Sequence, residues 1–165
     1  MIYKIFGLML IIFSSYIFGV IKSNELKGEF KLLNQYKTDL IYLKNNLGFS
    51  RKPILDLIED LLDNGTILNE MYTGFIMLSK NKDFKEAWLE NLDKFHFSAK
   101  AKRCFQAFPD LFGVVDSNGQ IDVLENHILN IANDIDDARC YFDKNEKLLK
   151  NTGLYIGILT AVLLI

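Results

Sequence analysis

A single helical pattern runs from near Asn118 to the C-terminus and leaves few folds open to this chain. Along it, apolar residues recur in steps of three and four, at Ile121, Leu124, Ile128, Ile131, Ile135, Ala138, Phe142 and, one heptad later, Leu149. This spacing is typical of a helix that packs lengthwise on other helices. At 1.5 Å per residue, the part before Gly153 would be roughly 50 Å long. The rest of the chain must therefore pack against this helix or anchor it.

The two ends of this pattern carry different signals. Asp116 and Ser117 can cap its start with their side-chain oxygens. From Gly153 onward the charged residues disappear, and residues 153–165 are almost wholly apolar. About 12 apolar residues would alone indicate a buried or interfacial helix. Their position at the end of a continuing helix favours a short membrane segment, so we predict one over 153–165.

The N-terminal stretch, residues 5–21, is apolar for about 17 residues, which is near the lower limit for crossing a bilayer. Lys4 precedes it and Lys22 follows it. A cleaved signal peptide is the competing interpretation, but residues 18–23 contain no Ala-x-Ala-like site. We therefore predict an uncleaved transmembrane anchor over residues 1–22. The flanking charges are nearly balanced, so they leave its orientation open.

Residues 23–152 show helical periodicity and no run of strand-like alternation. Helix-start signals punctuate this stretch at Pro53, Thr66, Asp83 (with Glu86 completing a capping box) and Ser98. Short connections favour antiparallel neighbours. We predict an all-α fold, an antiparallel bundle of about six helices over residues 23–152, flanked by the N- and C-terminal membrane segments.

Composition argues against several classes of function. The net charge is −2 and the 19 basic residues are scattered, which does not favour a nucleic-acid ligand. Cys104 and Cys140 form no CxxC motif and are expected to be helix-packing thiols. His96, between two phenylalanines, fits packing or capping. His127 shares a helical face with residues 130 and 134 at metal-compatible spacing, but so do many solvated faces. We predict no enzyme activity, cofactor or metal.

One tract resembles a known family. Phe108-x-x-x-Phe112-Gly113-x-x-Asp116-x-x-x-Gln120 is similar to the F-x-x-x-L-G-x-x-D-x-x-x-Q signature of stage III sporulation protein AB, with Phe112 in place of leucine. Further matches follow in the family's order, at Pro53-Ile54, at Ala87-Trp88 with Leu92, and at Lys150, Gly153 and Gly157. Pro109 departs from the pattern, where a small residue is more usual. The resemblance covers essentially the whole chain.

The resemblance implies a membrane component of the assembly that links the mother cell to the engulfed forespore. The soluble bundle would lie on the cytoplasmic side of the mother-cell membrane, beside the assembly's ATPase, a stage III sporulation protein AA-like protein. The family is also similar to the cytoplasmic helical domain of platform proteins in type II secretion and type IV pilus assembly. A general platform protein and an enzyme of unknown type are the alternatives.

A cytoplasmic partner would most easily reach the turn before the long helix, residues 109–120. Within it, the signature residues Phe112, Gly113, Asp116 and Gln120 are the candidate docking residues. Loss of the Asp116 helix cap alone would cost about 1 kcal/mol, so a docking role must be separated from a folding role.

Overall fold

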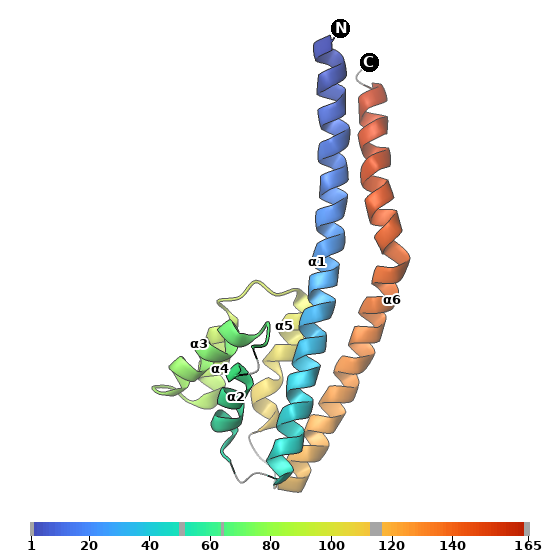
Figure 1. The fold of residues 1–165 in the computed structure, drawn as a ribbon. Helices are drawn as coiled ribbons and strands as arrows, with labels where there is room; N and C mark the ends of the chain where they lie inside the picture. Colours follow the sequence, from blue (N-terminus) through green and yellow to red (C-terminus); the bar gives the residue numbers. More distant parts are fainter. Residues whose placement is uncertain (1, 50–51, 64, 113–116, 164–165) are drawn as a thin grey trace. The chain divides into compact units, whose positions relative to one another are not determined.

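The computed structural model describes residues 2–49, 52–63, 65–112 and 117–163, and these residues form helices joined by turns, with no β-strand among them. The elements are α1 (Ile2–Phe49), α2 (Ile54–Asp63), α3 (Asn69–Ser79), α4 (Phe84–Leu92), α5 (Ala99–Gln106), the 3₁₀ helix η1 (Phe108–Leu111) and α6 (Ser117–Leu163) (Figure 1). The all-α class and the long C-terminal helix are confirmed. The antiparallel bundle and the membrane segments stay predictions.

The chain divides into two compact units. One is Lys31–Ile135, and the other combines Met1–Phe30 with Asp136–Ile165. Each of the long helices α1 and α6 contributes residues to both units. The predicted domain limits after residues 22 and 152 stay predictions.

In the unit Lys31–Ile135, α1 buries one face at helical spacing, formed by Leu33, Tyr36, Leu40 and Leu43. The facing turns of α6 bury Leu124, Ile131 and Ile135, three of the positions predicted from the sequence. An ion pair between Lys44 and Glu125 joins α1 to α6 at 3.6 Å. Apolar burial along both helices is the main stabilising contribution here.

The connection between α2 and α3 differs from the prediction made from the sequence. Gly65, two residues after the end of α2 at Asp63, has φ +63°, a left-handed conformation that suits glycine. The next helix begins at Asn69, so its predicted start at Thr66 is wrong. The Thr66 hydroxyl donates to Asn69 Oδ1 at 2.9 Å, and Asn69 Nδ2 donates to the Leu62 carbonyl at 3.2 Å. These side-chain bonds hold residues 66–68 as a turn.

The helix starts predicted at Asp83 and Ser98 are confirmed. The Asp83 side chain accepts a hydrogen bond from the Lys85 N–H, and the Ser98 hydroxyl accepts one from the Ala101 N–H. Each bond satisfies a backbone donor that has no partner within the first helical turn. The caps fix where α4 and α5 begin, and therefore which of their residues face the core.

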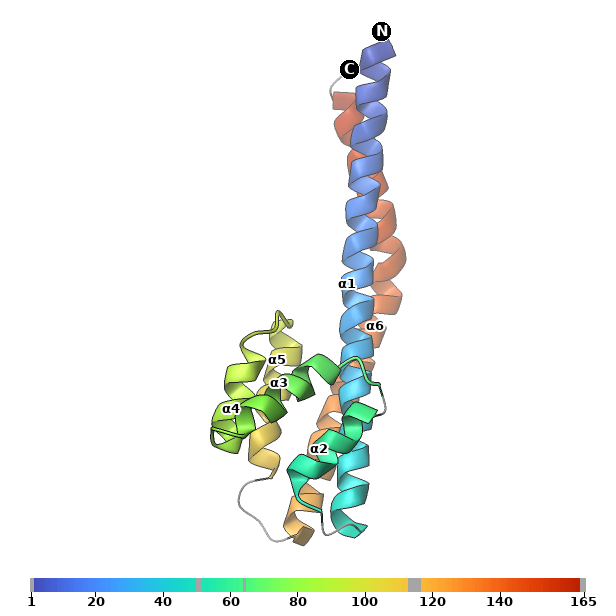
Figure 2. The same ribbon diagram turned by 60° about the vertical axis from the view of Figure 1, so that its left-hand side comes forward.

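Helices α3 and α4 lie side by side in both views (Figures 1 and 2) and approach closely where α3 has Gly74. Asn91 of α4 is buried, and its Nδ2 donates to the Met71 carbonyl at 2.7 Å. A Cβ on Gly74 would collide with the Asn91 amide group. Glycine therefore makes room for a buried polar bond between the two helices.

The aromatic core of this unit centres on Trp88. Its ring stacks on Phe108 with centroids 4.0 Å apart, and it meets Phe75 edge-on at 5.1 Å. The indole Nε1 donates to the Phe105 carbonyl at 2.7 Å, so the polar edge of the ring is satisfied although it is buried. Trp88 thereby links α4 to α3, α5 and η1.

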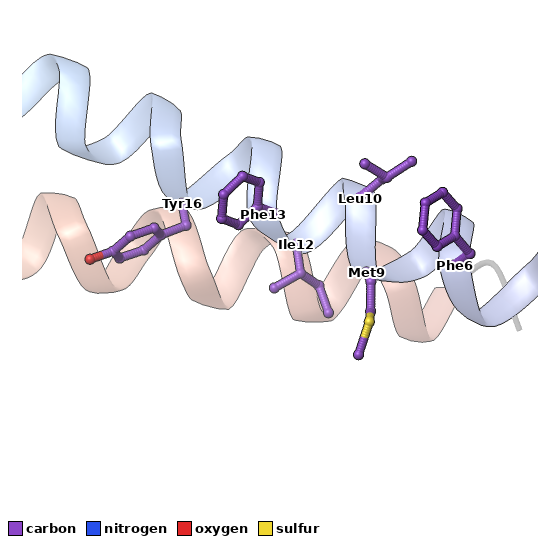
Figure 3. Close-up of a pocket in the computed structure, with 6 residues that line it drawn as sticks. All are labelled: Phe6, Met9, Leu10, Ile12, Phe13 and Tyr16. Carbon is purple, nitrogen blue, oxygen red and sulfur yellow. The ribbon is translucent and has the colours of Figure 1, made fainter.

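The other unit contains an exposed apolar surface on α1. Phe6, Met9, Leu10 and Phe13 are each more than half exposed. Figure 3 shows them, with Ile12 and Tyr16, on successive turns of α1. These six residues line an open pocket of about 680 Å³. A row of large apolar side chains is costly to expose to water.

Of the described helices, α1 alone has a stretch, within Met9–Leu47, that is long and apolar enough to cross a membrane. Only 12% of that stretch is buried, in contrast to the core helix of a soluble protein. An anchor and a signal sequence share this composition and position. Several side chains of the predicted second segment, 153–165, lie outside the described residues.

Candidate functional site

The turn that leads to the candidate docking residues is shaped by Pro109. The sequence requires the helix before it to end or bend, and α5 ends at Gln106. Pro109 then lies in the first turn of η1, where its missing N–H removes no helical hydrogen bond. The Phe112 N–H donates to the Pro109 carbonyl at 3.2 Å, which closes the last turn of η1.

The half-buried Phe112 ring anchors this turn to the aromatic core. Its centroid lies 4.9 Å from that of Phe108 and 6.2 Å from that of Phe84, both in edge-on geometries. Phe112 replaces the leucine of the family signature, and the aromatic contacts give its larger side chain a defined position. Part of the ring remains accessible to a partner.

Two of the four candidate docking residues come together. Gln120 Nε2 of α6 donates to the Phe112 carbonyl at 3.5 Å, at the long limit of a hydrogen bond. Gly113 and Asp116, together with the predicted cap at Asp116, lie outside the described residues. The structure thus brings Phe112 and Gln120 into contact, and both are partly exposed.

An exposed ion pair lies beside this turn. Lys85 Nζ of α4 contacts Asp110 Oδ1 of η1 at 2.6 Å, and both side chains are more than half exposed. Exposed ion pairs contribute little to folding because water screens them. Their charges remain available to a charged partner surface. We define the tip surface as Lys85, Asp110, Phe112 and Gln120.

A second polar cluster lies where α1, α5 and α6 meet. His127 of α6 packs edge-on to Tyr36, with ring centroids 6.2 Å apart, and its Nε2 is buried without a hydrogen-bond partner among the described residues. Lys100 Nζ contacts Asp134 Oδ1 at 3.1 Å, and the Cys104 thiol lies 3.8 Å from Asp134 Oδ2. The cluster joins histidine, thiol and carboxylate groups.

Burial disfavours the charged forms of two groups in this cluster, His127 and Cys104. Burial lowers the pKa of His127, while a hydrogen bond to the Cys104 backbone acts in the opposite direction. Burial and the Asp134 carboxylate raise the pKa of the Cys104 thiol. A thiol with a raised pKa is a poor nucleophile, because the thiolate is the reactive form. These residues are therefore suited to packing between helices.

Several candidate residues occupy places that the sequence did not indicate. His96, predicted to have a packing or capping role, is exposed, which does not fit packing and leaves capping a prediction. The flanking rings of Phe95 and Phe97 stack on each other at 5.6 Å. Cys140 is also exposed, unlike Cys104. Asn130 faces solvent, and in the part of the chain that the structure describes no three His, Cys, Asp or Glu side chains are placed to hold a metal ion.

The sequence analysis missed a buried carboxylate, Asp39 on α1. Only 2% of Asp39 is exposed, and Gln35 Nε2 and the Tyr72 hydroxyl each donate to it at 2.8 Å. Burial raises its pKa, and the two hydrogen bonds oppose that change. The available signal was its spacing, because Asp39 comes three residues after Tyr36 and four before Leu43, on the buried face of α1.

Comparison with known proteins supports the resemblance seen in the sequence. The family model of stage III sporulation protein AB matches residues 4–165. Comparisons with curated proteins and with solved structures found no match. The family match spans both compact units and includes the tip surface.

Proposed function

This chain belongs to the stage III sporulation protein AB family, and we propose that it is a non-enzymatic membrane component of the assembly that joins the mother cell to the engulfed forespore. The match over residues 4–165 carries the proposal, because it includes both apolar chain ends as well as the helices between them. In this role the protein is a platform for the assembly's cytoplasmic ATPase.

The surface of α1 supports a membrane anchor. Its first turns expose large apolar side chains, and no charged residue interrupts the stretch between Lys4 and Lys22. Insertion into lipid would remove this surface from water and requires no unpaired backbone groups, because the segment is helical. In our proposal this anchor lies in the mother-cell membrane around the forespore and the C-terminal segment enters the same membrane. Residues 23–152 form the cytoplasmic part.

The tip surface is the proposed contact with the ATPase. It combines a partly accessible aromatic ring at Phe112, an amide at Gln120 and the exposed charges of Lys85 and Asp110. Aromatic side chains surrounded by polar groups are common at the centres of protein interfaces. A stage III sporulation protein AA-like ATPase is the partner that the family resemblance implies.

Substitution of the tip residues tests this contact. We expect Phe112→Ala and Gln120→Ala each to lower co-purification of the ATPase with the tagged full-length chain about fivefold or more, the loss typical of residues at an interface centre. The measurement is quantitative immunoblotting of the ATPase after solubilising host membranes in mild detergent.

Asn130→Ala is the matched control, because Asn130 is an exposed amide on the same helix, about 15 Å along the axis from Gln120. Thermal unfolding of each purified variant separates lost binding from lost folding. Equal recovery of the ATPase with all variants, or a loss of binding that only parallels a loss of folding, would remove the tip surface from the proposal.

A further inference from the structure

The buried carboxylate of Asp39 is only partly satisfied by the protein. Oδ1 accepts a hydrogen bond from Gln35 and Oδ2 accepts one from Tyr72, both at 2.8 Å. An ionised carboxylate can accept about four hydrogen bonds. At least one further donor could therefore approach this group without displacing either protein partner.

A cavity of about 270 Å³ has Asp39 among its lining residues. Gln35, Thr38, Asp39 and Tyr42 of α1 form one side, and Leu61 of α2 lies on the other. The turn before α3 contributes Thr66 and Ile67, and Ile67 is 61% exposed at the cavity. All of these residues belong to the unit Lys31–Ile135.

The size and lining of this cavity restrict what it could bind. Small-molecule pockets usually have volumes of about 300–1,000 Å³, so this cavity suits a single side chain better than a cofactor. The residues that line it include the aromatic Tyr42, the aliphatic Leu61 and Ile67, and the acidic Asp39. Lysine and arginine have the complementary form, an apolar stem that ends in a charged donor group.

In the part of the chain that the structure describes, no cationic side chain is paired with Asp39. Among these residues, the groups that act on its carboxylate are Gln35 and Tyr72. Other carboxylates of the same unit do have such partners, including Asp60 with Lys52 and Asp110 with Lys85. A buried carboxylate without a cation is costly unless a donor compensates for it.

We propose that this cavity is a binding site for one lysine or arginine side chain of a partner protein, with Asp39 as its counter-ion. Gln35 and Tyr72 hold the carboxylate in place. Thr38 and Thr66 offer hydroxyl groups at the cavity wall, and Tyr42 and Ile67 cover the apolar stem. The site is separate from the tip surface in its residues, so either can fail without the other.

Small cations that mimic the two side chains can test this site. The full-length chain in detergent micelles would carry ¹³C-labelled isoleucine methyl groups, with the Ile67 signal assigned through Ile67→Val. The probes are n-butylammonium, n-butylguanidinium, N-acetyl-lysine N-methylamide and, as the neutral control, 1-butanol. We expect the three cations to shift the Ile67 signal with saturation and 1-butanol to leave it unchanged.

Two substitutions distinguish the role of Asp39 from general surface charge. Asp39→Asn should weaken binding of the cations about tenfold or more, because it removes a charge-assisted hydrogen bond. Glu59→Gln, which removes an exposed carboxylate of α2 outside the cavity, should leave the affinity unchanged. Equal shifts with 1-butanol, or unchanged affinity in Asp39→Asn, would overturn the proposal.

A third substitution, Thr38→Phe, tests the site if the Asp39→Asn variant does not fold. Thr38→Phe adds bulk at the exposed wall of the cavity and leaves Asp39 in place. It should abolish cation binding while the thermal midpoint stays near that of the unsubstituted chain. Binding that survives Thr38→Phe would contradict the site. Binding of n-butylammonium without binding of the capped lysine would contradict the assignment to a protein side chain.

Discussion

Trp88→Ala is expected to lower the free energy of unfolding by about 3–5 kcal/mol. Trp88 is 1% exposed and stacks on Phe108, so the substitution leaves a cavity at the junction of α3, α4, α5 and η1. It also leaves the Phe105 carbonyl without the indole donor. Denaturant unfolding of the full-length chain in mild detergent, followed by far-ultraviolet circular dichroism, measures the loss. Fluorescence is unsuitable because Trp88 is the single tryptophan.

Trp88→Phe separates the two contributions. The phenyl ring retains most of the stacking on Phe108 but cannot donate to the Phe105 carbonyl, so a smaller loss of roughly 1–2 kcal/mol is expected. Similar small losses in both variants would show that Trp88 is not the centre of the aromatic core.

Gly74→Ala is expected to lower the free energy of unfolding by about 2–4 kcal/mol, although alanine normally favours a helix. The added methyl group would occupy the space of the Asn91 amide, which must then move away from the Met71 carbonyl. Overpacking and a broken buried hydrogen bond both contribute to the loss. The same unfolding measurement applies.

Gly28→Ala is the matched control, because a Cβ on Gly28 meets no atom within 4 Å and Gly28 also lies inside a long helix. It should be neutral or slightly stabilising. The double substitution of Gly74 and Asn91 by alanine should be less destabilising than the sum of the two single changes, because it restores the missing space. A Gly74→Ala variant as stable as Gly28→Ala would contradict the close packing of α3 on α4.

Apolar periodicity and capping residues predicted most of the helices, because both signals involve only residues that are close together in the sequence. The spacing of Leu124, Ile131 and Ile135 predicted a buried face that the structure confirms. The Asp83 and Ser98 caps are equally local, since each side chain bonds a backbone N–H two or three residues ahead. Such signals do not depend on what the rest of the chain does.

The features that the sequence did not predict depend on contacts between distant residues. Gly74 is required because Asn91, from the next helix, lies against it. Tyr72, one of the two donors to the Asp39 carboxylate, lies thirty-three residues away from it in the chain. Thr66 resembles a helix cap, but its hydroxyl bonds the Asn69 side chain instead of a backbone N–H. No local pattern identifies these bonding and packing partners.

The candidate docking residues show the same division. The resemblance to the family signature made Phe112 and Gln120 candidate docking residues, and their docking role stays a prediction. The structure adds a hydrogen bond from the Gln120 amide to the Phe112 carbonyl. The neighbouring Lys85–Asp110 pair was not predicted, because it joins α4 to η1 across twenty-five residues. The tip surface as a whole therefore required the structure.

Deletion of the gene in its spore-forming host, followed by membrane-stain microscopy through growth and sporulation, tests the proposed role most directly. The proposal predicts normal vegetative growth and forespores that complete engulfment but then stall or shrink, with recovery when the gene is restored. Normal spore formation together with a loss of secretion or of surface fibres would contradict it, and would favour a general secretion or pilus platform instead.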